Sequence, residues 1–117
     1  MTITIAPHPG RVRVRFNGQT VVDTTRALAL QEGGYKPVLY LPRADADMTL
    51  FARTAQTTRC PHKGQASYYS LKVGDRTAAN AVWTYETPHD QVAAIRGHLA
   101  FYPDRVDAIE EEEVAAA

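Results

Sequence analysis

The chain has 117 residues, which is the common size of one domain built around a single hydrophobic core. Its 44% hydrophobic and 22% charged content, with a formal net charge of zero, is typical of a globular protein and argues against disorder. Outside the acidic run 110–113 the chain is mildly basic, but its basic residues are too scattered to predict a nucleic-acid groove.

The single cysteine, Cys60, excludes an intramolecular disulfide and a zinc site built from several thiolates. The N-terminal residues 1–16 hold no uninterrupted apolar segment behind a basic start, which argues against an export signal. No apolar run approaches the roughly 20 residues that span a bilayer. We therefore expect a cytoplasmic protein with neither a membrane nor a nucleic acid as its partner.

The clearest local prediction is a hairpin near the N-terminus. Residues 11–16 alternate strictly, so that Val12 and Val14 lie on one face of a strand and the arginines between them lie on the other. Asn17 and Gly18 tolerate the positive φ angles that a two-residue hairpin turn requires, and residues 20–22 supply the returning strand.

The next segments have weaker signals. Residues 24–32 fit either a continuing strand or one helical turn, and Gly33-Gly34 ends them. Residues 37–42 are β-rich and bounded by prolines, which predicts a strand ending at Pro42. A turn is expected at 45–47, and the apolar residues 48–51 fit either a strand or the end of that turn.

The C-terminal half has clearer signals. We predict a second hairpin from residues 66–73 and 76–85, with its turn at Gly74-Asp75. A short helix is expected over 89–95, a strand over 98–102 and a returning strand over 106–109. The whole of 1–117 is interpreted as one domain, with an ordered body at about 10–110 and a flexible acidic tail at 110–117.

The order of several motifs resembles the family called domain of unknown function 427, from about Val12 to Asp107. The motifs that carry the resemblance are Tyr40-Leu41-Pro42, residues 58–64 (TRCPHKG), Tyr68-Tyr69-Ser70, Trp83-Thr84-Tyr85 and Phe101-Tyr102. This resemblance implies a mainly β, antiparallel two-sheet β-tent, or Mss4-like, fold around a central cavity, with one or two short helices. Zinc-binding relatives of that architecture use cysteines to hold the sheets together, and a chain with one cysteine cannot do so.

The family is sometimes labelled nucleotidyltransferase, but the chain has no motif for that chemistry. It has no Gly-Ser pair followed by spaced carboxylates, and no glycine-rich phosphate loop of the GxxxxGK[ST] kind. We expect no cofactor.

Residues 58–64 bring a thiol, an imidazole and an ammonium close together in the sequence. Cys60 is a weak candidate for a nucleophile, with His62 or the distant His98 as its base, but an inert structural cysteine is the commoner outcome. A Cys-x-His pair leaves a tetrahedral zinc shell half empty, so no metal site is predicted. Lys63 beside Gly64 fits an anion anchor at the mouth of a cavity about as well as a solvated loop residue.

Other candidate ligand-binding residues are aromatic or lie at a strand end. Arg43 follows a predicted strand and could clamp an anion. Trp83 is expected to be largely buried with its indole N–H satisfied, on the same face as Tyr85. The residues expected to line the cavity and anchor its ligand are Tyr40, Arg43, Lys63, Tyr68, Trp83 and Tyr85.

The sequence therefore predicts a binding domain for a small organic or anionic ligand, held in a cavity between the sheets. Two alternatives stay open. One is an enzyme with Cys60 as nucleophile on an activated carbonyl or phosphorylated substrate. The other is a protein-interaction module, monomeric or homodimeric, that pairs through an exposed β edge at residues 11–16, although edge arginines argue against such pairing.

Overall fold

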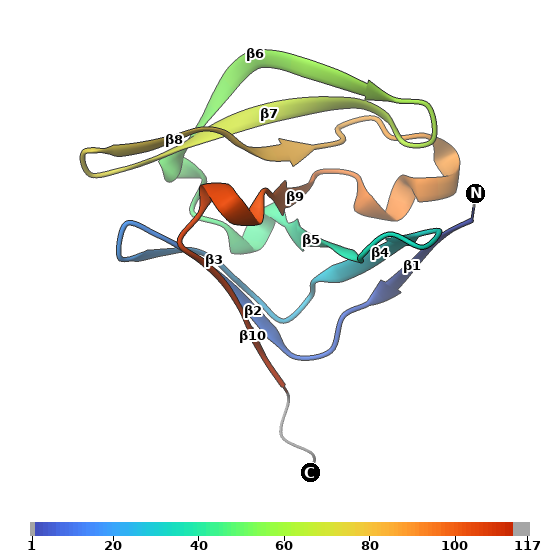
Figure 1. The fold of residues 1–117 in the computed structure, drawn as a ribbon, viewed down its shortest axis with the longest axis horizontal. Helices are drawn as coiled ribbons and strands as arrows, with labels where there is room; N and C mark the ends of the chain where they lie inside the picture. Colours follow the sequence, from blue (N-terminus) through green and yellow to red (C-terminus); the bar gives the residue numbers. More distant parts are fainter. Residues whose placement is uncertain (1, 114–117) are drawn as a thin grey trace.

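The computed structural model describes residues 2–113. Its strands are β1 (Ile3–Pro7), β2 (Arg11–Phe16), β3 (Gln19–Thr24), β4 (Leu28–Glu32), β5 (Val38–Pro42), β6 (Phe51–Cys60), β7 (Gly64–Val73), β8 (Arg76–Thr84), β9 (His98–Phe101) and β10 (Ala108–Glu112) (Figure 1). Short 3-10 segments connect some of them: η1 (Arg43–Asp45), η2 (Met48–Leu50), η3 (Asp90–Ile95) and η4 (Pro103–Arg105). Among the described residues, no helix is long and apolar enough to cross a membrane.

The strands form two antiparallel sheets, which confirms the predicted fold class. The larger sheet has seven strands in the order β1-β4-β5-β9-β8-β7-β6, and the smaller has three in the order β10-β2-β3. Figure 1 shows β10, β2 and β3 lying across one side of the larger sheet, with β6–β8 at one end of that sheet and β1–β4 at the other. The arrangement is consistent with a sandwich or tent-like fold, and the resemblance implies a tent.

Both faces of the larger sheet are buried, and strand alternation divides its apolar residues between two cores. The first core lies against the smaller sheet and takes Leu41 and Tyr69 together with Val14. The second core lies on the opposite face and takes Tyr40 and Tyr68, their immediate neighbours in the chain. Because successive side chains on a strand point to opposite faces, one aromatic-rich sheet supplies both cores.

The predicted hairpin at residues 11–22 is present. Asn17 has φ 50° and Gly18 has φ 76°, the left-handed conformations that the turn requires. However, β2 is the central strand of the smaller sheet, paired with β3 on one side and β10 on the other. The hypothesis that residues 11–16 form an exposed interaction edge is therefore wrong, because β10 covers that edge.

Ordered strands extend beyond the expected bounds of 10–110. β1 pairs with β4, and Ile3 and Ile5 pack on the second core. At the other end Glu110 and Glu112 belong to β10, opposite Arg13 and Arg11 respectively. The expectation of a flexible tail from 110 is wrong for this part, because β10 continues to Glu112 and pairs with β2 as far as its first residue, Arg11. The expected flexibility of 114–117 lies outside the described residues.

Two more segments differ from the expectations. β6 runs from Phe51 to Cys60 as an edge strand, where the sequence suggested only a short apolar piece and then a loop. Its signal is weak because most of its side chains are exposed, so the apolar alternation is missing. The segment expected as a helix over 89–95 is the 3-10 segment η3, with non-helical backbone at Val92.

Candidate functional site

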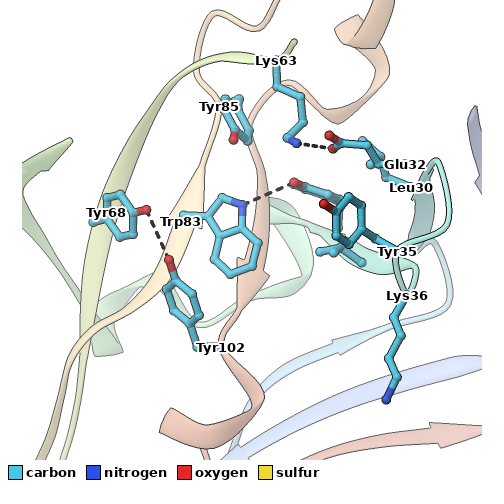
Figure 2. Close-up of a pocket in the computed structure, with 11 residues that line it drawn as sticks. Leu30, Glu32, Tyr35, Lys36, Lys63, Tyr68, Trp83, Tyr85 and Tyr102 are labelled. Atoms are coloured by element: carbon cyan, nitrogen blue, oxygen red, sulfur yellow. Dashed lines mark hydrogen bonds and ion pairs between the residues drawn. The ribbon is translucent and has the colours of Figure 1, made fainter. Parts of the chain in front are cut away.

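A pocket of about 310 Å³ opens on the second-core face of the larger sheet (Figure 2). The residues that line it come from β4, the β4–β5 loop, β5, the β6–β7 turn, β7, β8 and the segments after β8 and β9. They are Leu30, Glu32, Tyr35, Lys36, Val38, Tyr40, Lys63, Tyr68, Trp83, Tyr85 and Tyr102. All belong to the larger sheet or its connecting segments, so this pocket, unlike the expected one, does not lie between the two sheets.

Trp83 occupies the middle of the pocket. Its indole Nε1–H donates to the Tyr40 hydroxyl at 3.3 Å, and the two rings meet edge-on with their centroids 6.4 Å apart. On another side Tyr102 packs against the indole with a centroid separation of 4.7 Å. The indole N–H therefore has a partner, as predicted.

Most of the Trp83 surface is buried against the second core, in keeping with the prediction, but part of the side chain remains exposed. The indole borders the pocket and also a second, mainly apolar cavity of about 340 Å³, which reaches Val14 and Ile109 of the smaller sheet. A ring that separates two cavities keeps accessible surface that a core residue would lose. Its exposed surface is available to a ligand.

Tyrosine hydroxyls make up much of the polar lining. The Tyr68 hydroxyl lies 3.0 Å from Thr58 Oγ1 and 3.3 Å from the Tyr102 hydroxyl. Burial and the hydrogen bond with Tyr68 raise the pKa of Tyr102 to about 12. Burial likewise raises the pKa of Tyr40 and the pKa of Tyr85. At Tyr40 the hydrogen bond from Trp83 lowers the pKa and offsets part of this effect. These phenols therefore remain neutral O–H groups near neutral pH.

Tyr85 differs from the other pocket tyrosines. Its side chain is only 5% exposed, yet its hydroxyl makes no hydrogen bond with any residue of the described part of the chain. No fully sealed side-chain polar atom in that part lacks a partner, so the Tyr85 oxygen reaches the open space of the pocket. A buried phenol of this kind requires a partner from water or a ligand.

An ion pair lies at one end of the pocket. Lys63 Nζ donates to Glu32 Oε1 at 2.7 Å, and the two side chains are 13% and 19% exposed. Burial alone would lower the pKa of Lys63, but the Glu32 hydrogen bond, together with Cys60 and Tyr40 nearby, raises it above its usual value. Lys63 is therefore charged at neutral pH.

The chain around Lys63 is held in place by its neighbours. Gly64 has φ +110°, a conformation that L side chains rarely adopt, and it pairs with Cys60 to close the β6–β7 turn. The Lys63 carbonyl accepts from the His89 amide at 3.0 Å, and the His62 carbonyl accepts from Gln91 Nε2 at 3.0 Å. These contacts fix the turn against η3 and place the Lys63 ammonium beside Glu32.

Sequence reasoning missed Glu32 as a pocket residue. The available signal was its position at the end of a strand, directly before the Gly33-Gly34 turn, where a side chain can lie at the mouth of a pocket. Its partner Lys63 is distant in the chain and lies in the β6–β7 turn, so the two meet only through the tertiary arrangement of the larger sheet. Tyr102 and Tyr35 were also missed.

Arg43 is not brought to this pocket. Its guanidinium Nη1 donates to the Tyr69 hydroxyl at 2.6 Å, and its central carbon lies 5.6 Å from the Tyr69 ring centroid. Tyr69 belongs to the first core, on the face opposite the pocket. The structure therefore does not bring Arg43 together with Tyr40 and the other candidate residues, because Arg43 contacts Tyr69 on the opposite face of the sheet.

Cys60 ends β6 as a half-buried thiol packed against the second core. Within residues 2–113, no hydrogen bond joins it to His62 or His98. His98 Nδ1 instead lies 3.1 Å from the Arg96 carbonyl. The described residues also contain no cluster of three or more His, Cys, Asp or Glu side chains that could hold a metal ion.

Fold and pocket together define the class of protein: a mainly β, two-sheet domain with an aromatic, ion-paired pocket on its larger sheet. The chain belongs to the family described as Domain of unknown function (DUF427), whose model matches residues 4–112. No curated protein matches the chain.

Proposed function

We propose that the chain is a binding domain for a small organic molecule, held in the pocket around Trp83. The observation that supports this most directly is Tyr85, a phenol 95% withdrawn from solvent whose hydroxyl faces the pocket without a partner in the described chain. A buried hydroxyl without a partner is destabilising, by about 1–3 kcal/mol, unless something in the pocket satisfies it. A ligand that accepts a hydrogen bond from Tyr85 fills that role.

The polar groups of the pocket favour a ligand with hydrogen-bond acceptors. The phenols are donors because burial keeps them protonated, and the Lys63 ammonium uses only one of its three N–H groups on Glu32. A ligand carboxylate, carbonyl or ring nitrogen would accept from these groups. An anion bound to Lys63 would also meet the Glu32 carboxylate, so the anchor is not a free positive charge.

The walls of the pocket favour a ring. Trp83 presents a half-buried indole face, with Tyr40 edge-on to it and Tyr102 beside it. Aromatic pairs are stabilised by about 0.5–1.5 kcal/mol beyond the area that they bury. A cavity of about 310 Å³ lies at the lower end of the range of small-molecule sites, which is about 300–1,000 Å³. The pocket fits a compact metabolite with one ring.

The proposal is tested by a ligand screen read through the one tryptophan of the chain. Purified protein is first analysed by native mass spectrometry for copurified molecules, and ring-bearing compounds are then titrated while Trp83 fluorescence is recorded. We expect a subset to change the emission. Tyr85→Phe should weaken those ligands by about tenfold, the effect of one hydrogen bond near 1.4 kcal/mol.

Tyr69→Phe is the matched control, because Tyr69 is equally buried but bonds Arg43 on the opposite face. This variant should bind as the parent does. If no compound copurifies and none alters Trp83 emission, the binding function is wrong. It is also wrong if Tyr85→Phe and Tyr69→Phe bind every hit equally well.

A further inference from the structure

We propose that the ligand is a small zwitterion with a ring, whose carboxylate binds Lys63 and whose ammonium binds Glu32. This assignment rests on the proposed binding function and narrows it to a chemical class, of which an aromatic amino acid is the simplest example. It gives Glu32 a role in specificity, in addition to its contact with Lys63.

Each member of the ion pair has hydrogen-bonding capacity left over. Lys63 Nζ donates to Glu32 Oε1 at 2.7 Å, and this is the one side-chain hydrogen bond that either residue makes within residues 2–113. Two ammonium hydrogens and the second carboxylate oxygen therefore remain available for a ligand. Both side chains line the pocket and are mostly withdrawn from solvent. A ligand that approaches this end meets a donor and an acceptor side by side.

Charge balance decides between the possible ligands. The pair carries no net charge, so an anion bound to Lys63 would leave two carboxylates beside one ammonium in a half-enclosed pocket. A cation bound to Glu32 would leave the opposite imbalance. A zwitterion satisfies both ions and keeps the local charge at zero, which avoids the cost of an uncompensated buried charge.

Lys36, the other cation of the pocket, does not change the charge balance at the Lys63–Glu32 pair. Lys36 also lines the pocket, but its ammonium points away from Lys63 and Glu32 in Figure 2. Trp83 and its hydrogen-bond partner Tyr40 line the same pocket as Lys63 and Glu32. A molecule with its charged groups at the pair therefore places its ring on Trp83.

The test compares three probes that share a phenyl ring: L-phenylalanine, 3-phenylpropanoate, which lacks the ammonium, and 2-phenylethylamine, which lacks the carboxylate. Each is titrated into the full-length protein at constant pH and ionic strength, with the Trp83 indole N–H resonance as the readout. We expect phenylalanine to bind about tenfold or more tightly than either of the other two, because each charge-assisted contact contributes at least that much.

Variants identify the contacts. Glu32→Gln should remove the preference for phenylalanine over 3-phenylpropanoate, and Lys63→Met should remove the preference over 2-phenylethylamine. Lys36→Met is the control for a lost positive charge and should keep both preferences. If a single variant does not fold, the double variant Glu32→Gln with Lys63→Met leaves no unpaired ion and should bind the three probes with equal affinity.

The outcomes separate this inference from the function on which it rests. If 3-phenylpropanoate or 2-phenylethylamine binds as tightly as phenylalanine, the zwitterion class is wrong and the binding function stands. The class is equally wrong if the compound screen yields ligands but none of the three probes binds. It is also wrong if Glu32→Gln keeps the full preference for phenylalanine. Failure of the screen and of all three probes rejects the binding function itself.

Discussion

Single residues of the larger sheet act according to the face on which they lie. Tyr68 reaches the pocket while its neighbour Tyr69 is buried in the first core, and the same division separates Tyr40 from Leu41. In a sheet covered on one face, one member of each pair would be exposed. Here both faces are covered, so residue type alone does not distinguish a pocket tyrosine from a core tyrosine.

The pocket tyrosines predict how stability depends on alkaline pH. The folded chain raises the pKa of Tyr40, Tyr85 and Tyr102 above the usual 10.0, and that of Lys63 above 10.5. A group with a raised pKa keeps its proton in the folded state at a pH where the unfolded chain has released it. Stability is therefore complete below about pH 10 and falls as the pH rises from there towards the folded values.

This dependence can be measured by urea unfolding at several values between about pH 9 and about pH 12. Tyr85→Phe should lose less stability over that range than the parent, because one of the raised groups is gone. Tyr35→Phe is the control, since Tyr35 is 68% exposed and should leave the pH dependence unchanged. Parallel pH curves for the parent and Tyr85→Phe would contradict the prediction.

At the scale of elements, β10 is joined to β2 by charge and by a close backbone approach. Glu112 Oε2 accepts from Arg13 Nη1 at 2.9 Å, although these exposed ions contribute little by themselves. The closer constraint is Gly10, which precedes β2 with φ +91°. A Cβ at this position would lie 2.2 Å from the Glu112 carbonyl oxygen. Only glycine allows β10 to pair along the full length of β2.

Gly10→Ala should therefore lower the free energy of unfolding by about 2–4 kcal/mol, from left-handed strain and the displacement of β10. Urea denaturation measures this loss directly. Gly34→Ala is the matched control, because a Cβ there meets nothing within 4 Å, and it should change stability by less than about 0.5 kcal/mol. Equal stability of the two variants would show that β10 shifts without cost.

On the scale of the whole molecule, the pocket depends on β1, which lies far in the sequence from Trp83 and the pocket tyrosines. β1 is one of the two edge strands of the larger sheet, and within residues 2–113 its one partner is β4, which carries Leu30 and Glu32. Ile3 and Ile5 pack on the second core, to which the pocket tyrosines Tyr40, Tyr68 and Tyr85 belong, and not on the first. The N-terminal strand thus supports the pocket side of the molecule selectively.

Deletion of residues 2–7 should accordingly destabilise the chain by about 3 kcal/mol, from two half-buried isoleucines and the lost ladder hydrogen bonds. The tryptophan emission should shift to the red, because the second core would loosen around Trp83. The double variant Ile3→Thr with Ile5→Thr keeps the ladder and should retain part of the lost stability. A deletion variant as stable as the parent, with unchanged emission, would refute this role for β1.

Local sequence patterns were sufficient to predict the strands that depend on alternation and on turn residues within a short stretch of chain. The hairpin at residues 11–22 follows from strict alternation and the Asn17-Gly18 turn, and the strands at β5, β7 and β8 follow from β-branched and aromatic runs between turn residues. Alternation also separated Tyr68 from Tyr69 and put Trp83 with Tyr85. These features depend on residues close together in the chain, so periodicity and turn chemistry are sufficient to predict them.

Only the tertiary structure decided the rest, because it depends on which strands become neighbours. β6 is an edge strand without apolar alternation, and β1 is an edge strand in which only Ile3 and Ile5 alternate with polar residues. Their backbone hydrogen bonds, which any sequence can make, do not identify the partner strand. The tertiary arrangement of the strands also brings Glu32 to Lys63 and places Arg43 against Tyr69. Composition and spacing indicated the kinds of side chain in the pocket, whereas strand order determined which of them meet and how their charges are balanced.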